Sequence, residues 1–134
     1  MIFWDNQSTD KSKAIFDSYQ DNRLKYYYTK EHTHLGVARA RAFNHLSGDF
    51  IALLDTDDVW FPKKLEKQLQ LFEDPEVGLV ISDAMFFNES NERVVYKGDY
   101  PPEGNVFREL LTGYFVVLSS LMLRKSVVYR LDYG

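Results

Sequence analysis

The sequence contains no cysteine, which excludes disulfides, zinc ribbons and thiol nucleophiles. Glycine is also scarce, and because Gly36 and Gly48 stand alone they form no glycine-rich phosphate loop. No apolar run approaches the roughly 20 residues needed to span a bilayer, and no signal peptide opens the chain. Basic residues are fewer than acidic ones, and the net charge of −4 argues against a nucleic-acid-binding protein. We therefore expect a soluble, cytoplasmic domain without a transmembrane segment.

Apolar and aromatic side chains, by contrast, are abundant. Hydrophobic residues make up 45% of the chain and aromatic residues 16%, against 27% charged residues, so a disordered chain is excluded. The 134 residues have the length of one modest domain. A domain of this size removes roughly two-thirds of its unfolded surface from water, which is enough to support a core without crosslinks.

Apolar runs of strand length alternate with stretches of helical periodicity. The run 50–54 is apolar throughout, as in a strand buried on both faces, and the apolar residues of 62–73 recur at i, i+4 and i+7. This alternation predicts an α/β fold with a Rossmann-like, mostly parallel sheet flanked by helices. We expect strands at 1–4, 24–29, 50–54, 77–81 and 116–123, helices at 11–20, 36–46, 62–73 and 105–112, and a hairpin within 84–104.

Carboxylates follow three of the expected strands, where open α/β sheets bind their ligands. The densest group is Asp55-Thr-Asp-Asp58, and single residues Asp5 and Asp83 follow two other strands. Mg²⁺ and Mn²⁺ prefer oxygen ligands and often take one or two carboxylates together with substrate phosphates. The acidic group therefore indicates a divalent-cation site. The alternative is a solvated turn in which Asp58 or a neighbour caps the helix that starts at Pro62.

Two further residue types suit a nucleotide at the same edge of the sheet. Asp5 is placed to accept hydrogen bonds from a ribose hydroxyl or a base N–H, but it could equally be a turn carboxylate bonded to the amides of Gln7 and Ser8. Arg39 and Arg41 lie two positions apart on one expected helix, so they point to different faces and at most one reaches the site. A solvated arginine is the alternative for each.

Other motifs favour structural roles. His32 and His34 have no third ligand of matching type near in sequence, so a zinc site is disfavoured. The run Tyr26–Tyr28 is typical of strand packing rather than of a sugar platform. The basic pairs Lys63-Lys64 and Arg124-Lys125 are interpreted as solvated ends of elements.

Taken in order, several of these segments resemble the inverting glycosyltransferase family 2, whose members have the GT-A fold. The resemblance extends over essentially the whole chain and is best over 1–83. The segments that carry it are WDNQSTD at 4–10, LGVAR at 35–39, GDFIALLDTDDVW at 48–60, PKKLEKQ at 62–68 and VGLVISD at 77–83.

The resemblance implies transfer of a sugar, with inversion, from a UDP-sugar or dTDP-sugar donor. The acceptor would be a hydroxyl of a glycan, a lipid-linked glycan or a protein, as in polysaccharide biosynthesis, and the cofactor would be Mn²⁺ or Mg²⁺. The acidic DXD motif would place Asp55 and Asp57 at the donor and Asp57 and Asp58 at the metal, with Asp58 the first choice as a ligand. Asp5 would contact the base or ribose, and Arg39 the base or diphosphate.

The resemblance also has departures and gaps. Asn6-Gln7 stands where the family usually has Asp-Gly, and Ala40 replaces an asparagine. Family members begin with a strand and helix that precede the first strand here, and their catalytic base is expected beyond Gly134. We therefore expect a partial domain, with a nucleotide-sugar and metal-binding part at 1–83 and the start of an acceptor-side part at 84–134.

Three functional alternatives follow. The parent would be an enzyme, soluble or peripheral to a membrane, of which this fragment alone has little or no activity. A rival is a non-catalytic nucleotide-sugar-binding or assembly module that kept the fold. A third is a structural domain with an accidental acidic turn. A missing central strand would leave sheet edges that could pair between chains, so a homo-oligomer also stays open.

Overall fold

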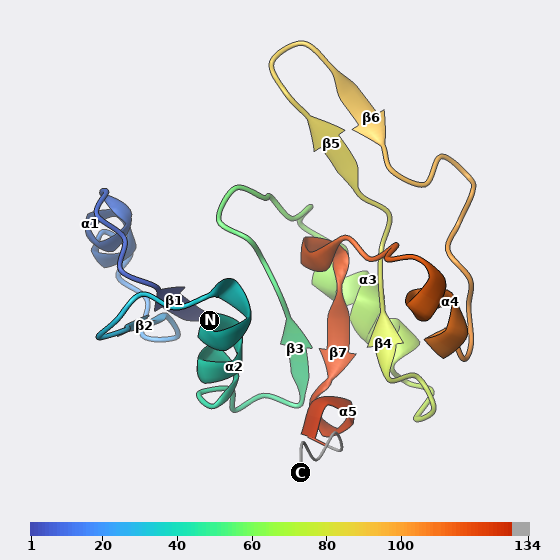
Figure 1. Cartoon of the computed structure of the whole chain (residues 1–134), viewed down its shortest axis with the longest axis horizontal. Coiled ribbons are helices and arrows are strands. Elements are labelled where there is room, and N and C mark those ends of the chain that lie inside the picture. The colour runs from blue at the N-terminus through green and yellow to red at the C-terminus, as the bar shows by residue number, and fades with distance from the viewer. Residues whose placement is uncertain (130–134) are drawn as a thin grey trace. The chain divides into compact units, whose positions relative to one another are not determined.

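The computed structural model describes residues 1–129 and divides the chain into two compact units, 1–47 and 48–134 (Figure 1). Positions 130–134 of the expected acceptor-side part lie outside the described residues. Both units combine helices and strands, which confirms the α/β class expected from the alternating pattern.

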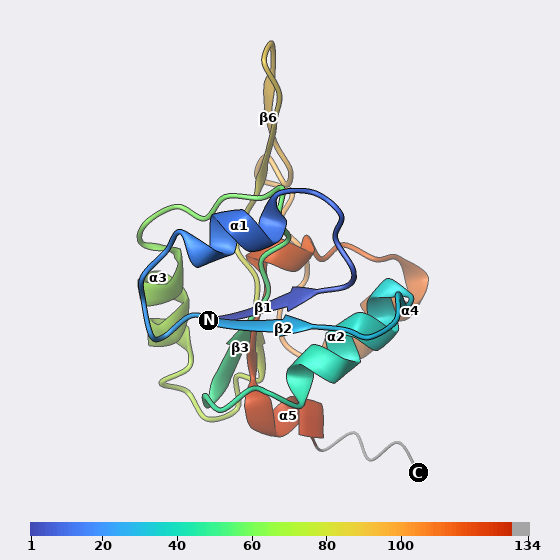
Figure 2. The ribbon, with the colours of Figure 1, turned by 90° about the vertical axis from the view of Figure 1, so that its left-hand side faces the viewer.

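The first unit is a β-α-β segment followed by a second helix. Strands β1 and β2 pair in parallel, with Asp5 opposite Tyr28, as expected for two strands joined through a helix (Figure 2). The elements are β1 (Ile2–Asp5), α1 (Ser12–Asp17), β2 (Lys25–Tyr28) and α2 (Leu35–Phe43).

Aromatic side chains pack both faces of this strand pair. Phe3 and Tyr26 stack at 5.7 Å between ring centroids, and Phe16 of α1 lies 5.2 Å from the Tyr26 ring. Because side chains alternate along a strand, Trp4 and Tyr27 face the other way, and there Tyr27 meets His45 at 3.9 Å. The interpretation of the tyrosine run as strand packing is confirmed for Tyr26 and Tyr27.

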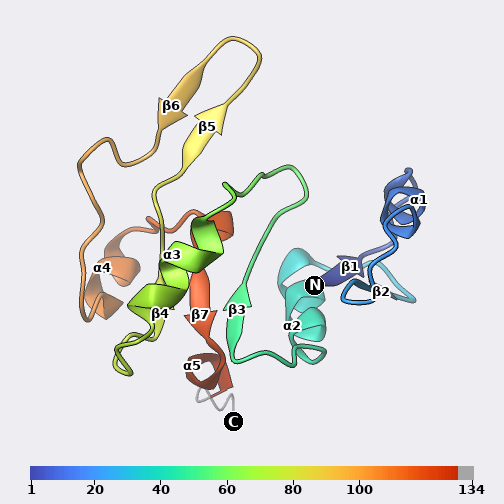
Figure 3. The same cartoon turned by 180° about the vertical axis from the view of Figure 1, so that it is seen from behind.

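The second unit is built on a three-stranded sheet of order β3-β7-β4, with α3 covering one face and the β5–β6 hairpin extending away from it (Figure 3). The hairpin expected within 84–104 is confirmed. The elements are β3 (Phe50–Ala52), α3 (Lys64–Leu71), β4 (Leu79–Val80), β5 (Met85–Phe87), β6 (Glu92–Val94), α4 (Phe107–Thr112), the 3-10 helix η1 (Leu118–Ser120), β7 (Met122–Arg124) and α5 (Lys125–Tyr129).

The direction of β7 differs from the mostly parallel sheet that the sequence predicted. Met122 of β7 lies opposite both Ala52 of β3 and Val80 of β4, and both pairings are antiparallel. Strands β3 and β4 therefore share one direction, as expected, but β7 lies between them in the opposite sense. The expected strand at 116–123 also begins later, because Leu118–Ser120 form a 3-10 turn first.

The core of the second unit lies between α3 and the sheet. Phe72, Val80 and Met122 form its buried centre. Arg124 is only half-exposed, and its guanidinium donates hydrogen bonds to the carbonyls of Phe72 at 2.9 Å and Val77 at 3.2 Å. The interpretation of Arg124 as a solvated end is therefore wrong, because the C-terminus of α3 leaves carbonyls that need a donor.

Candidate functional site

The acidic loop after β3 is fastened at two points to one buried serine. The backbone N–H of Asp55 donates to Ser119 Oγ at 3.0 Å, and the indole N–H of Trp60 donates to the Ser119 carbonyl at 2.7 Å. Between these points the N–H of Asp58 donates to the Asp55 carbonyl at 3.1 Å, which closes a turn. The loop therefore has a defined backbone course, although most of its side chains face water.

The carboxylates of this loop differ in exposure. Asp55 is half-buried, whereas Asp57 and Asp58 are exposed. Helix α3 begins at Lys64, and no side chain caps its N-terminus. The alternative in which Asp58 or a neighbour caps this helix is therefore wrong, and both exposed carboxylates keep their oxygens for other partners.

The exposed carboxylates Asp57 and Asp58 offer the oxygen donors that divalent cations such as Mg²⁺ prefer. Within residues 1–129, no three histidine or acidic side chains come together as a ready metal-binding group. Mg²⁺ and Mn²⁺ sites that bind phosphorylated substrates need only one or two carboxylates, with phosphate and water oxygens completing the shell. Asp57 and Asp58 fit that open type of site.

A groove of about 790 Å³ adjoins the acidic loop within the second unit. Its walls come from the acidic loop, the first turns of α3, the chain after β4, the β5–β6 hairpin and η1. Asp58 and Asp83 both line it. Asp83 Oδ1 accepts the N–H groups of Ala84 at 2.8 Å and Tyr96 at 3.3 Å, so this carboxylate holds the base of the hairpin.

In the first unit, Asp5 ends β1 and is only 2% exposed. Its Oδ1 accepts the N–H of Ser8 at 2.6 Å, and its Oδ2 accepts the hydroxyl of Tyr26. Burial raises the pKa of Asp5, but the bonds from Tyr26 and Ser8 outweigh it and leave the pKa below its usual value. The turn-carboxylate alternative describes this geometry, with Ser8 rather than Gln7 as the observed amide donor.

The turn that follows Asp5 is held by its own polar side chains. Asn6 Nδ2 donates to the Thr33 carbonyl at 2.6 Å, and Gln7 Nε2 donates to the Lys30 carbonyl at 2.9 Å. Gln7 has a φ of 72°, a left-handed conformation in which glycine is easier. The two residues that depart from the usual Asp-Gly therefore attach the turn to the loop after β2.

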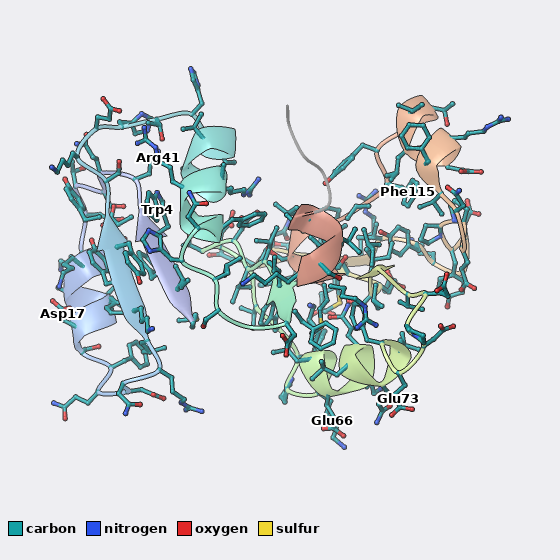
Figure 4. The ribbon with its side chains drawn as sticks, turned by 90° about the horizontal axis from the view of Figure 1, so that it is seen from below. Trp4, Asp17, Arg41, Glu66, Glu73 and Phe115 are labelled. Atoms are coloured by element: carbon teal, nitrogen blue, oxygen red, sulfur yellow. The ribbon has the colours of Figure 1, made fainter. Side chains whose placement is uncertain are left out.

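The two arginines of α2 have different surroundings. Arg41 forms an ion pair with Glu31 at 3.2 Å and donates to Thr29 Oγ1 at 3.3 Å, and Figure 4 shows it with Trp4 on the α2 side of the strands. Arg41 therefore orders the loop that precedes the helix. Arg39 is half-buried two positions earlier, on another face.

The predicted site residues thus fall into two groups. Asp5 and Arg39 belong to the first unit, and Asp55, Asp57 and Asp58 belong to the second. Sequence reasoning missed Tyr26 as the partner of Asp5 and Ser119 as the anchor of the acidic loop. The only signal for Tyr26 was its place next to β1 in a β-α-β unit. Ser119 lies 64 positions from Asp55, and no local pattern marks it.

The sequence model of the family described as "Glycosyl transferase family 2" matches residues 1–131. The chain belongs to this family. Its mixed arrangement of strands and helices is consistent with the GT-A-like domain that the resemblance implied. Within the part of the chain that the structure describes, no helix is long and apolar enough to cross a membrane.

Three relatives illustrate the family's range. An uncharacterized glycosyltransferase of Methanocaldococcus jannaschii is 30% identical over 99% of the chain and 47% of its own length. A UDP-Glc:alpha-D-GlcNAc-diphosphoundecaprenol beta-1,3-glucosyltransferase of Escherichia coli is 32% identical over 53% of the chain and 28% of its own length. An uncharacterized glycosyltransferase of Haemophilus influenzae is 38% identical over 52% of the chain and 28% of its own length. The chain thus spans about half or less of these relatives.

Proposed function

We propose that the chain forms the donor-binding and metal-binding part of an inverting glycosyltransferase that uses a nucleotide-diphosphate sugar. The observation that carries this proposal is the pair of exposed carboxylates, Asp57 and Asp58, on a loop whose backbone is held by Ser119. Family membership supports the transferase class, and the name of the Escherichia coli relative, which includes UDP-Glc, supports a UDP-sugar as the donor.

In the proposed reaction, an acceptor hydroxyl oxygen bonds to the anomeric carbon as the bond from that carbon to the diphosphate breaks. The hydroxyl proton passes to a base, and the nucleoside diphosphate leaves as an anion. A bound Mn²⁺ or Mg²⁺ supplies charge neutralisation to that leaving group. Asp57 and Asp58 would hold the cation, and Asp55 and Arg39 would bind the donor.

Asp5 has a different part in this proposal. Its carboxylate is buried and accepts bonds from Ser8 and Tyr26, so it supports the turn beside the nucleotide. A direct bond from the base or ribose would have to reach a carboxylate that is only 2% exposed. We therefore assign Asp5 to positioning in the donor site as it stands in this structure.

The decisive experiment is calorimetric titration of the chain with UDP, with and without Mn²⁺. We expect binding that needs the cation and that weakens at least about tenfold in Asp58→Ala, because a lost charged ligand is worth about 1.4 kcal/mol or more. Asp99→Ala is the matched control, since Asp99 is an exposed aspartate that does not line the groove. UDP binding that is equal with and without Mn²⁺ would refute the metal assignment.

A further inference from the structure

The C-terminal end of the acidic loop is held by the side chain of Trp60. This residue lies two positions after Asp58, and its indole N–H donates to the Ser119 carbonyl at 2.7 Å. A single hydrogen bond holds the indole nitrogen but leaves the ring free to turn about the N–H···O direction. The course of the backbone from Asp58 to Trp60 therefore depends on what else touches the ring.

The ammonium group of Lys64 makes that second contact. Its Nζ lies 4.4 Å from the centre of the Trp60 ring, within the range of a cation–π interaction. The Lys64 side chain is half-buried, and this burial lowers its pKa, so the ammonium is partly removed from water. A cation–π contact is strongest when the cation is desolvated. The contact is therefore suited to fix the plane of the ring, which the hydrogen bond leaves free.

The side chain of Gln68 holds Lys64 in turn. The two residues are four positions apart on α3, so they lie on one face of the helix. Gln68 is only 3% exposed; its Oε1 accepts a hydrogen bond from Lys64 Nζ at 2.8 Å, and its Nε2 donates to the Ser120 carbonyl at 2.8 Å. Because Ser119 and Ser120 are neighbours in η1, these contacts form a closed ring that begins and ends on the same 3-10 turn.

We propose that Lys64 and Gln68 are positioning residues of the proposed metal site. They hold the Trp60 ring, and the ring holds the end of the loop on which the two exposed carboxylates lie. Carboxylates at a fixed spacing bind a cation more tightly than carboxylates on a mobile loop, because the mobile loop loses conformational entropy on binding. The role rests on the proposed function and deepens it, since it names what presents the metal ligands.

The first test measures how UDP affinity depends on Mn²⁺, by calorimetric titration with UDP at a series of free Mn²⁺ concentrations. The Mn²⁺ midpoint is the concentration at which UDP affinity is half-maximal. We expect it to rise about three- to tenfold in Lys64→Met and in Gln68→Met. Lys64→Arg should recover most of the loss, because arginine keeps a cation over the ring.

The same helix offers matched controls for both substitutions. Lys67→Met removes one positive charge from the same groove, and Gln70→Met removes one side-chain amide. Both residues are exposed, so we expect neither control to move the Mn²⁺ midpoint. Urea denaturation shows which variants fold, and Lys64→Met, at a half-buried position, tests the proposal even if the buried Gln68→Met does not fold.

A second readout follows the Trp60 ring itself. The chain has two tryptophans, so Trp4→Phe makes Trp60 the sole reporter. We expect lower fluorescence anisotropy of Trp60 in Lys64→Met and in Gln68→Met, because a released ring moves on a faster timescale than a held one. Lys67→Met should leave the anisotropy unchanged. This measurement needs neither UDP nor Mn²⁺.

Several outcomes would overturn the inference. These are unchanged anisotropy, equal changes in test and control variants, equal Mn²⁺ midpoints in Lys64→Arg and Lys64→Met, or a midpoint in Lys64→Met that is unchanged or lower. The midpoint would not move if Lys64 only bound the diphosphate, and it would fall if Lys64 only repelled the cation.

The two readouts also separate this inference from the proposed function. Mn²⁺-dependent UDP binding whose midpoint is insensitive to Lys64→Met refutes only the positioning role. Absence of Mn²⁺-dependent UDP binding, together with lower anisotropy in Lys64→Met, refutes the donor site while confirming the restraint on Trp60.

Discussion

At the scale of single residues, Asp5 and Ser119 show how side chains distant in sequence define the site. Asp5 ends a strand and is followed by the polar segment 6–10, which by itself suggests exposure to water. In the structure, Asp5 is buried and accepts a hydrogen bond from the Tyr26 hydroxyl of the neighbouring strand. No sequence motif marks Ser119. In the structure it accepts hydrogen bonds from the Asp55 backbone N–H and from the Trp60 indole N–H. Each contact satisfies a buried polar group, and leaving such a group unpaired costs about 1–3 kcal/mol.

Tyr26→Phe tests the Asp5 contact through its pH dependence. A carboxyl with a lowered pKa in the folded state stabilises the fold above its unfolded pKa, and this contribution disappears as pH falls through the folded pKa. Burial and the bond to Asp5 raise the pKa of Tyr26 to about 12, so the phenol stays a donor at neutral pH. We expect Tyr26→Phe to lose about 1–2 kcal/mol of unfolding free energy at pH 7 and less at an acid pH well below the ordinary aspartate pKa of 3.8.

Urea denaturation at both pH values measures this effect. Tyr28→Phe is the control, because Tyr28 lies on the same strand but is exposed. A loss in Tyr26→Phe that is the same at both pH values would show that the hydroxyl does not stabilise the Asp5 carboxylate.

At the scale of elements, α3 and its neighbours show how segments far apart complete one another. Arg124 of β7 bonds the carbonyls at the C-terminal end of α3, and its guanidinium lies over the rings of Phe50 and Phe72. Gln68 of the same helix donates to the Ser120 carbonyl at 2.8 Å. Helix α3 is thus positioned by polar contacts at both its middle and its end, in addition to its apolar face.

Gly78→Ala tests the close packing of the chain before β4 against α5. An added Cβ would lie 2.9 Å from Val127 Cγ2, closer than real contacts allow, and valine is stiff at this branch. We expect a loss of about 1–3 kcal/mol in unfolding free energy. Val127→Ala should recover part of it in the Gly78→Ala background.

Chemical denaturation of Gly78→Ala, Val127→Ala and the double variant measures the coupling free energy between these two positions. Gly36→Ala is the control, because nothing lies within 4 Å of the added Cβ in helix α2, and alanine favours a helix. Additive effects of Gly78→Ala and Val127→Ala would show that the two residues do not press on each other.

At the scale of the whole molecule, the chain is a family 2 member that covers 47% of its Methanocaldococcus jannaschii relative. The proposed donor and metal residues lie in both of its units. Transfer further requires a base that accepts the hydroxyl proton, and we expect that base outside residues 1–134, as the family resemblance implies. We therefore expect binding and turnover to be separable in this chain.

We expect the 134-residue chain to bind UDP with Mn²⁺ but to show no detectable sugar transfer by itself. The physical reason is that the attacking hydroxyl is a poor nucleophile unless its proton is removed. Release of UDP, measured with several UDP-sugars and a polyprenyl diphosphate-linked sugar, checks this. Robust transfer would show that a residue within the chain serves as the base.

The sequence predicted the α/β class and the place of most elements, because the apolar periodicities of 50–54 and 62–73 are local properties. It also grouped Asp5, Asp83 and the acidic segment 55–58 as candidate site residues, because each follows an expected strand. It did not predict the antiparallel insertion of β7 or the role of Arg124. Both depend on pairings across 40 or more positions, as in Met122 with Val80 and Arg124 with Val77.

The sequence by itself therefore determined which side chains are available for chemistry and the family to which they belong. Tertiary structure decided which of them stay exposed. Asp57 and Asp58 stay exposed on a loop that is held through its backbone, whereas the Asp5 carboxylate is buried and accepts hydrogen bonds from Ser8 and Tyr26. Local pattern selects residue types, but solvent exposure and hydrogen-bond partners come from packing between distant segments.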